Sequence, residues 1–108
     1  MSSEDELVVV LCTVPDGTTA ETLAKGLLDE RLAACINVIS GVKSFYRWQG
    51  KIASDTEIQL LIKTRRGRFD ALAAWLDAHH PYDVPEIVAM PAEQVSAAYL
   101  AWALEQTS

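Results

Sequence analysis

The chain has 108 residues and a mass of 11.8 kDa, and half of its residues are hydrophobic while 22% are charged. This balance predicts one packed domain rather than a disordered chain. Fifteen acidic and nine basic residues give a net charge of −6, which argues against binding to nucleic acid or to anionic lipid.

The first residues of the chain and the number of cysteines indicate in which cellular compartment the protein is expected. No apolar run approaches the roughly 20 residues that span a bilayer. The first six residues include three acidic ones, whereas a signal peptide begins with positive charge. Two cysteines are too few for a disulfide scaffold. We therefore expect a cytoplasmic protein with no membrane partner.

We expect a disordered tail over residues 1–6, followed by a single domain over residues 7–108. Within this domain the spacing of apolar residues alternates between the period of a strand and that of a helix. The expected elements are strands at 7–14, 34–48, 51–64 and 84–90, and helices at 20–32, 67–79 and 93–104. This βαββαβ order with an extra C-terminal helix predicts an α+β ferredoxin-like sandwich.

Turn-forming residues set several of these boundaries. The β-branched run at 7–14 predicts a strand buried on both faces, and Thr18 or Thr19 is the expected N-cap of the first helix. Ser40-Gly41 interrupts the second strand, as a bulge or bend does. Pro81 ends the second helix, because the residue before a proline is disfavoured in helical conformation.

The strands at 34–48 and 51–64 form an unusually long hairpin, joined at Gln49-Gly50, that extends past the rest of the sheet. Phe45, Tyr46 and Trp48 lie close to its tip. These aromatic side chains either cover the sheet or form a surface between molecules. We favour the second interpretation and expect a closed homo-oligomer.

The two cysteines and two histidines are the sulfur and imidazole side chains that can bind a metal ion. Cys12 and Cys35 are expected first of all to be small core residues. His79 and His80 end the second helix, where one imidazole can neutralise the helix terminus and the other can pack. Imidazole and thiolate together suit copper or zinc. The spacing of Cys12 from the histidine pair is not a local metal motif, so both interpretations stay open.

A basic cluster precedes the second helix, and an aromatic and acidic segment follows it. Residues 81–86, with two prolines, form a rigid entry to the fourth strand; alternatively, Tyr82 and Glu86 line a cleft beside Lys63 or Trp48. The sequence has no set of nucleophile, base and acid, so we do not expect an enzyme. The cluster is a solvated flank or an anion site, and it consists of Lys63, Arg65, Arg66 and Arg68.

Several segments, in order along the chain, resemble the CutA divalent-cation tolerance family. The resemblance covers residues 8 to 102 and implies a ferredoxin-like subunit in a homotrimer whose hairpin arms wrap neighbouring subunits. The matching segments are Val8–Thr13, Leu32–Asn37, Tyr46–Lys51, Leu61–Thr64, His79–Tyr82, Val84–Glu86 and Tyr99–Trp102.

The resemblance also implies binding of copper, or of another divalent metal ion such as zinc, and a role in metal tolerance. The positions credited with copper in the family correspond to Cys12, His79 and His80, and all three are present. Residues 92–96 depart from the family in lacking the glycine often found there. The resemblance makes metal binding our favoured hypothesis.

Two alternatives use the same fold. One is a trimeric signalling or scaffold protein, similar in shape to PII-like proteins, that binds small anions in clefts between subunits. Lys63, Arg65, Trp48 and Tyr82 would then form the site. The other is an enzyme of acylphosphatase type, which would need an arginine-bearing anion loop after the first strand. Residues 14–18 contain no arginine, so we rank it last.

Overall fold

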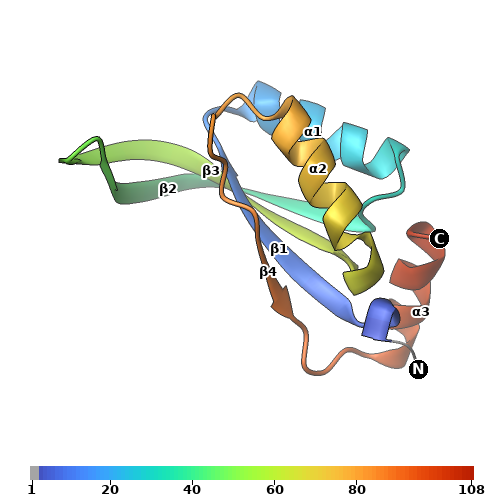
Figure 1. Cartoon of the computed structure of the whole chain (residues 1–108). Coiled ribbons are helices and arrows are strands. Elements are labelled where there is room, and N and C mark those ends of the chain that lie inside the picture. The colour runs from blue at the N-terminus through green and yellow to red at the C-terminus, as the bar shows by residue number, and fades with distance from the viewer. Residues whose placement is uncertain (1–2) are drawn as a thin grey trace.

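The computed structural model describes residues 3–108. Its strands are β1 (Leu7–Val14), β2 (Cys35–Trp48), β3 (Lys51–Arg65) and β4 (Val88–Pro91), and its α-helices are α1 (Gly17–Asp29), α2 (Phe69–His79) and α3 (Ala97–Gln106). The strands form one antiparallel sheet in the order β2-β3-β1-β4. α1 and α2 cover one face of this sheet (Figure 1). The predicted ferredoxin-like α+β fold is confirmed.

The core lies between the sheet and these two helices. Even-numbered residues of β1 alternate toward the helices, and Cys12 is one of them. Burying such apolar side chains contributes about 1.5–3 kcal/mol each. The largest fully buried aliphatic side chains are Val10, Val14, Leu23, Leu27, Leu60, Ile62, Leu72 and Leu76.

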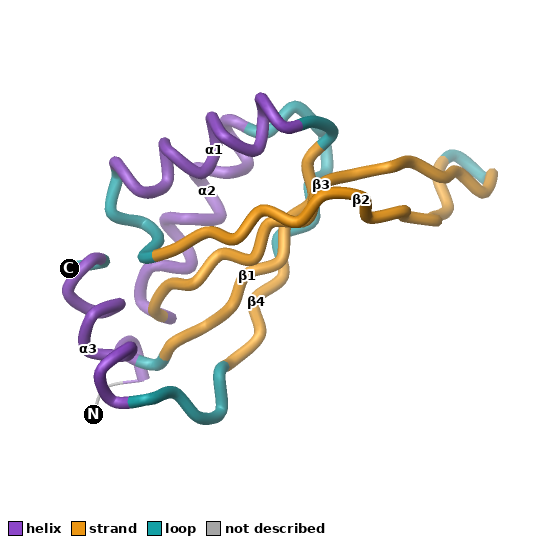
Figure 2. The backbone as a smooth tube through the Cα atoms, turned by 180° about the vertical axis from the view of Figure 1, so that it is seen from behind, coloured by secondary structure: helices purple, strands orange, loops and turns teal. Residues whose placement is uncertain are grey.

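β2 and β3 continue past the sheet as a two-stranded arm, residues 42–57, which projects on the side opposite to α3 (Figures 1 and 2). β1 pairs with β3 only as far as Val14 and Ile58, so the outer part of β3 pairs with β2 alone. A bulge between Ile39 and Val42 starts the arm. The arm gives the chain principal dimensions of 46 × 26 × 23 Å.

The tip of the arm is a tight turn at Gln49 and Gly50. Both residues have positive φ, 50° and 78° respectively. Two consecutive positive φ values are typical of the type I′ turn, whose twist matches that of a β-hairpin. The predicted reversal at these residues is confirmed.

The last strand is shorter than predicted, and the last helix begins later than predicted. β4 begins at Val88 rather than at residue 84. Pro85 has no N–H to donate to the neighbouring strand. The carbonyl of Thr13 on β1 already accepts a hydrogen bond from His80 and is not free for β4. α3 begins at Ala97 rather than at residue 93. Residues 92–96 instead link β4 to the helix, and Val95 packs against the cluster around Leu7 and Ala103.

The first helix begins and ends earlier than expected, and the second begins later than expected but ends at the predicted residue. Asp16, not Thr18 or Thr19, caps α1 by accepting the Thr19 N–H at 2.8 Å. α1 ends at Asp29, and Arg31 has a φ of 57°, which a helix does not allow. α2 begins at Phe69 because residues 66–68 form a 3-10 turn.

Residues 1 and 2 of the disordered tail expected over residues 1–6 lie outside the described residues. Within the rest of that segment, Ser3–Asp5 form a 3-10 helix. Asp5 is paired with Arg65 at 3.1 Å and Glu6 with Arg66 at 3.0 Å. These pairs hold residues 3–6 against the end of β3. Within residues 3–108, no helix has the length and apolar character needed to cross a membrane.

Candidate functional site

Cys12 and His80 meet at the carbonyl oxygen of Thr13. Cys12 is fully buried on β1, and its Sγ lies 3.8 Å from that oxygen. His80 follows α2, and its Nε2 lies 2.8 Å from the same oxygen. Its Nδ1 accepts the N–H of Tyr82 at 3.1 Å, so the ring proton is on Nε2 and donates to Thr13. The structure thus brings two of the predicted ligands together.

His79 is oriented differently from His80. Its ring stacks on Trp75 with centroids 4.0 Å apart, and its Nδ1 lies 2.7 Å from the Trp75 carbonyl oxygen. Since a carbonyl only accepts, Nδ1 carries the proton and Nε2 is left as an acceptor on an exposed side chain. His79 is therefore the one histidine with a nitrogen available to an ion from solvent without rearrangement.

The Cys12 thiol is protonated at neutral pH. Burial, followed by the charges of Glu86 and Glu57, raises its pKa to about 12. A metal ion binds the thiolate, so binding at Cys12 must release a proton. In the part of the chain that the structure describes, no three or more His, Cys, Asp or Glu residues are grouped so as to hold a metal ion. Cys12 and His80 would have to exchange present partners for the ion.

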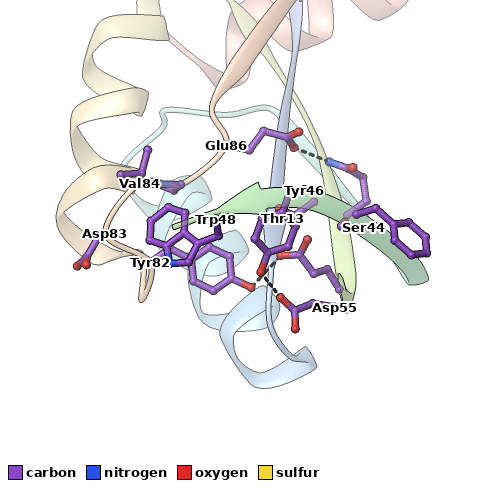
Figure 3. A pocket seen from close by; sticks show the side chains of 13 residues that line it. Thr13, Ser44, Tyr46, Trp48, Asp55, Tyr82, Asp83, Val84 and Glu86 are labelled. Carbon is purple, nitrogen blue, oxygen red and sulfur yellow. Dashed lines mark hydrogen bonds between the residues drawn. The ribbon is translucent and has the colours of Figure 1, made fainter. Parts of the chain in front are cut away.

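A cavity of about 690 Å³ lies at the base of the arm, between the arm and residues 82–86. We call it the arm cavity. Thr13, Glu57 and Gln59 line it from odd-numbered positions of β1 and β3, which alternate with the core-facing ones. Trp48 and Tyr82 also line it, as the cleft hypothesis expected, and Figure 3 shows them close together in the view.

Two tyrosine–carboxylate pairs hold the walls of the arm cavity. The Tyr82 hydroxyl donates to Glu57 at 2.8 Å, and the Tyr46 hydroxyl donates to Asp55 (Figure 3). Burial and the Glu57 charge raise the pKa of Tyr82, and the bond to Asp55 raises the pKa of Tyr46. Both phenols therefore stay neutral donors, and the carboxylates remain the charged partners.

The basic cluster does not line the arm cavity. Lys63 contacts Asn37 and Cys35, while Arg65 binds Asp5, Thr107 and the Leu104 carbonyl. Arg65 thus joins the start and the end of the described chain to β3. Arg68 adds a bond to the Thr107 carbonyl at 2.8 Å. The expected anion site of Lys63 and Arg65 with Trp48 and Tyr82 is thus not assembled within this chain.

Sequence reasoning missed Asp55, Glu57 and Tyr46 as cavity residues. A signal was present in the acidic residues 55 and 57, which alternate along a predicted strand that should carry apolar side chains. Their pairing with tyrosines was not visible. Tyr82 reaches Glu57 across 25 positions of the chain, a contact that strand periodicity does not predict.

The fold and this site define the chain as a ferredoxin-like protein with a projecting arm and a thiol–imidazole pair. The family model described as CutA1 divalent ion tolerance protein matches residues 8–106. The chain belongs to this family.

Relatives and solved structures agree over nearly the whole chain. The divalent-cation tolerance protein CutA of Thermus thermophilus is 50% identical over 92% of this chain and 96% of that protein. The CutA of Escherichia coli O139:H28 is 44% identical over 94% of this chain and 90% of that protein. The crystal structure of CutA1 from Oryza sativa matches with a TM-score of 0.94 at 40% identity, over 99% of this chain and 98% of that one. Membership in this family supports a role in divalent-cation tolerance.

Proposed function

We propose that this protein acts in divalent-cation tolerance by binding copper, or another divalent ion such as zinc, through Cys12, His79 and His80. The observation that carries the proposal is the convergence of the Cys12 thiol and the His80 imidazole on the Thr13 carbonyl. Thiolate and imidazole are ligands that copper and zinc accept. The role is binding rather than catalysis.

His79 and the buried pair contribute differently to this proposal. The exposed Nε2 of His79 is the donor that an arriving ion meets first. Cys12 and His80 bind once the thiol has lost its proton and His80 has released Thr13. Because a proton must leave Cys12, the affinity for copper rises with pH.

A competition titration tests the ligand set. Copper is titrated anaerobically against a chelator, with wild type, Cys12→Ser, His79→Ala and His80→Ala. Each variant is expected to lose affinity by at least about tenfold, since even residues outside the ligand shell change metal affinity on that scale. Cys35→Ser is the matched control and keeps wild-type affinity. Melting curves by circular dichroism check that each variant folds.

Equal affinity in wild type and all three ligand variants would contradict the proposal. Loss in His79→Ala alone would restrict binding to a surface imidazole and remove the buried pair from the site.

The proposal includes a homotrimer in the cytoplasm. The trimer is supported by exposed apolar side chains on the arm and on the sheet face away from the helices. The cytoplasm is supported by two free thiols, which suit a reducing compartment. The exposed apolar residues of the arm and of the sheet include Phe45, Ile52, Ile39, Val88 and Met90.

A further inference from the structure

We propose that the arm cavity binds a small organic amine that carries two or more ammonium groups. This inference goes beyond metal tolerance and does not rest on it, because Cys12, His79 and His80 are not among the residues that line the cavity.

The charge of the cavity favours a cation. Its lining includes four carboxylates and no lysine, arginine or histidine. The ion pairs found within residues 3–108 involve none of these carboxylates. The walls therefore repel anions. The four carboxylates are Asp55, Glu57, Asp83 and Glu86.

Glu57 is the most informative of the four. Glu57 is only 7% exposed. In the described chain, its carboxylate accepts a hydrogen bond from the Tyr82 hydroxyl. A buried carboxylate is costly unless a cation accompanies it. An ammonium group in the cavity would provide that cation while Tyr82 keeps its bond.

Aromatic rings favour an organic cation over a bare ion. Trp48, Tyr46 and Tyr82 line the same cavity as the carboxylates. Ammonium groups are attracted to the faces of such rings, most strongly to tryptophan. The rings also cover the apolar carbon chain between two ammonium groups, which a hydrated metal ion lacks.

Size and layout point to an elongated molecule. The volume of about 690 Å³ lies within the range of roughly 300–1,000 Å³ that is usual for small-molecule sites. The carboxylates are not grouped for a single metal ion within residues 3–108. Asp55 and Glu57 belong to β3, whereas Asp83 and Glu86 belong to the segment on the other side of the cavity. A molecule with an ammonium group at each end can pair with carboxylates of both walls.

The test is calorimetric titration of the purified full chain with spermidine, in its solution oligomeric state. Wild type is expected to bind saturably. Glu57→Gln keeps the acceptor for Tyr82 but removes the charge, and it should weaken binding by about tenfold or more, as the loss of a charge-assisted hydrogen bond does. Trp48→Ala changes an exposed side chain, so it should fold, and it should weaken binding roughly two- to fivefold.

Asp29→Asn is the matched control, since it removes one charge from an exposed position outside the cavity and should leave spermidine affinity unchanged. Magnesium chloride is the probe for simple attraction of cations. No heat of binding with spermidine would overturn the proposal. So would equal weakening in Glu57→Gln and Asp29→Asn, or unchanged affinity in Trp48→Ala. Magnesium binding as tight as spermidine binding would reduce the cavity to an acidic patch.

Discussion

The carbonyl oxygen of Thr13 holds two side chains of different chemistry. His80 donates to it from Nε2, while the Cys12 thiol approaches it from the core. The neutral imidazole and the protonated thiol are both satisfied in the described chain. A metal ion therefore competes with existing contacts, and its binding depends on the proton that Cys12 carries.

Raising the pH should destabilise the fold through Cys12. Its pKa rises from 9.0 to about 12 on folding, so the folded chain holds a proton that the unfolded chain releases above pH 9. The contribution of the Cys12 proton to the free energy of unfolding is complete below pH 9. It is lost as the pH rises toward 12, at up to roughly 1.4 kcal/mol of unfolding free energy per pH unit. Urea unfolding from pH 8 to 10.5 measures the loss.

Cys12→Ala is the comparison for this effect, since alanine cannot ionise. The free energy of unfolding of the variant should fall less steeply with pH than that of wild type. Identical pH profiles would mean that Cys12 does not carry the effect.

At the scale of residues, the resemblance to the family, rather than the spacing of the residues, singled out the three proposed ligands, and it did not give their arrangement. Cys12 was predicted to lie in the core because free cysteine is usually buried, and Pro81 predicted the end of a helix at the histidine pair. That His80 reaches the Thr13 carbonyl, and that His79 stacks on Trp75 instead, depends on contacts 67 and 4 positions apart in the chain. Periodicity carries no information about such rotamers.

At the scale of elements, the arm depends on its terminal turn. Gly50 has a φ of 78°, and a Cβ built there meets no atom within 4 Å. The need for glycine is thus conformational rather than steric. The arm has no helix packed on it to compensate for a distorted turn (Figure 2).

Gly50→Ala should therefore weaken the arm by about 1–2 kcal/mol, the cost of a left-handed conformation for a residue with a Cβ. Amide hydrogen exchange should become faster in residues 42–57 and stay unchanged in β1. Gly17→Ala is the matched control because its φ is not in the positive region. Unchanged exchange in the arm of Gly50→Ala would show that the turn is not limiting.

The order of the elements was predictable, and their ends were less so. β1 matches its predicted bounds because turn residues follow a continuous apolar run. β4 and α3 do not, since Pro85 and the packing of Val95 against Leu7 and Ala103 set their limits. The first limit is readable from the sequence, whereas the second is a tertiary contact.

At the scale of the whole molecule, much apolar surface is left exposed. Ile52 and Phe45 on the arm are 77% and 70% exposed. Exposed apolar surface of this kind marks an interface, and a projecting arm can reach a neighbouring copy. The proposed homotrimer would cover these residues.

Light scattering on the eluted protein should give three times the chain mass for wild type. Ile52→Glu should shift the population toward smaller species, because burial of each isoleucine contributes about 1.5–3 kcal/mol. Thr22→Glu, on the exposed face of α1, is the control and should keep the wild-type mass. A wild-type monomer would contradict the trimer.

The ligand set of bound copper is the central claim, and X-ray absorption at the copper edge observes it directly. We predict sulfur and imidazole nitrogen ligands in the copper-loaded wild type, with the sulfur lost in Cys12→Ser. A wild-type spectrum with oxygen and nitrogen ligands only, identical to that of Cys12→Ser, would contradict it.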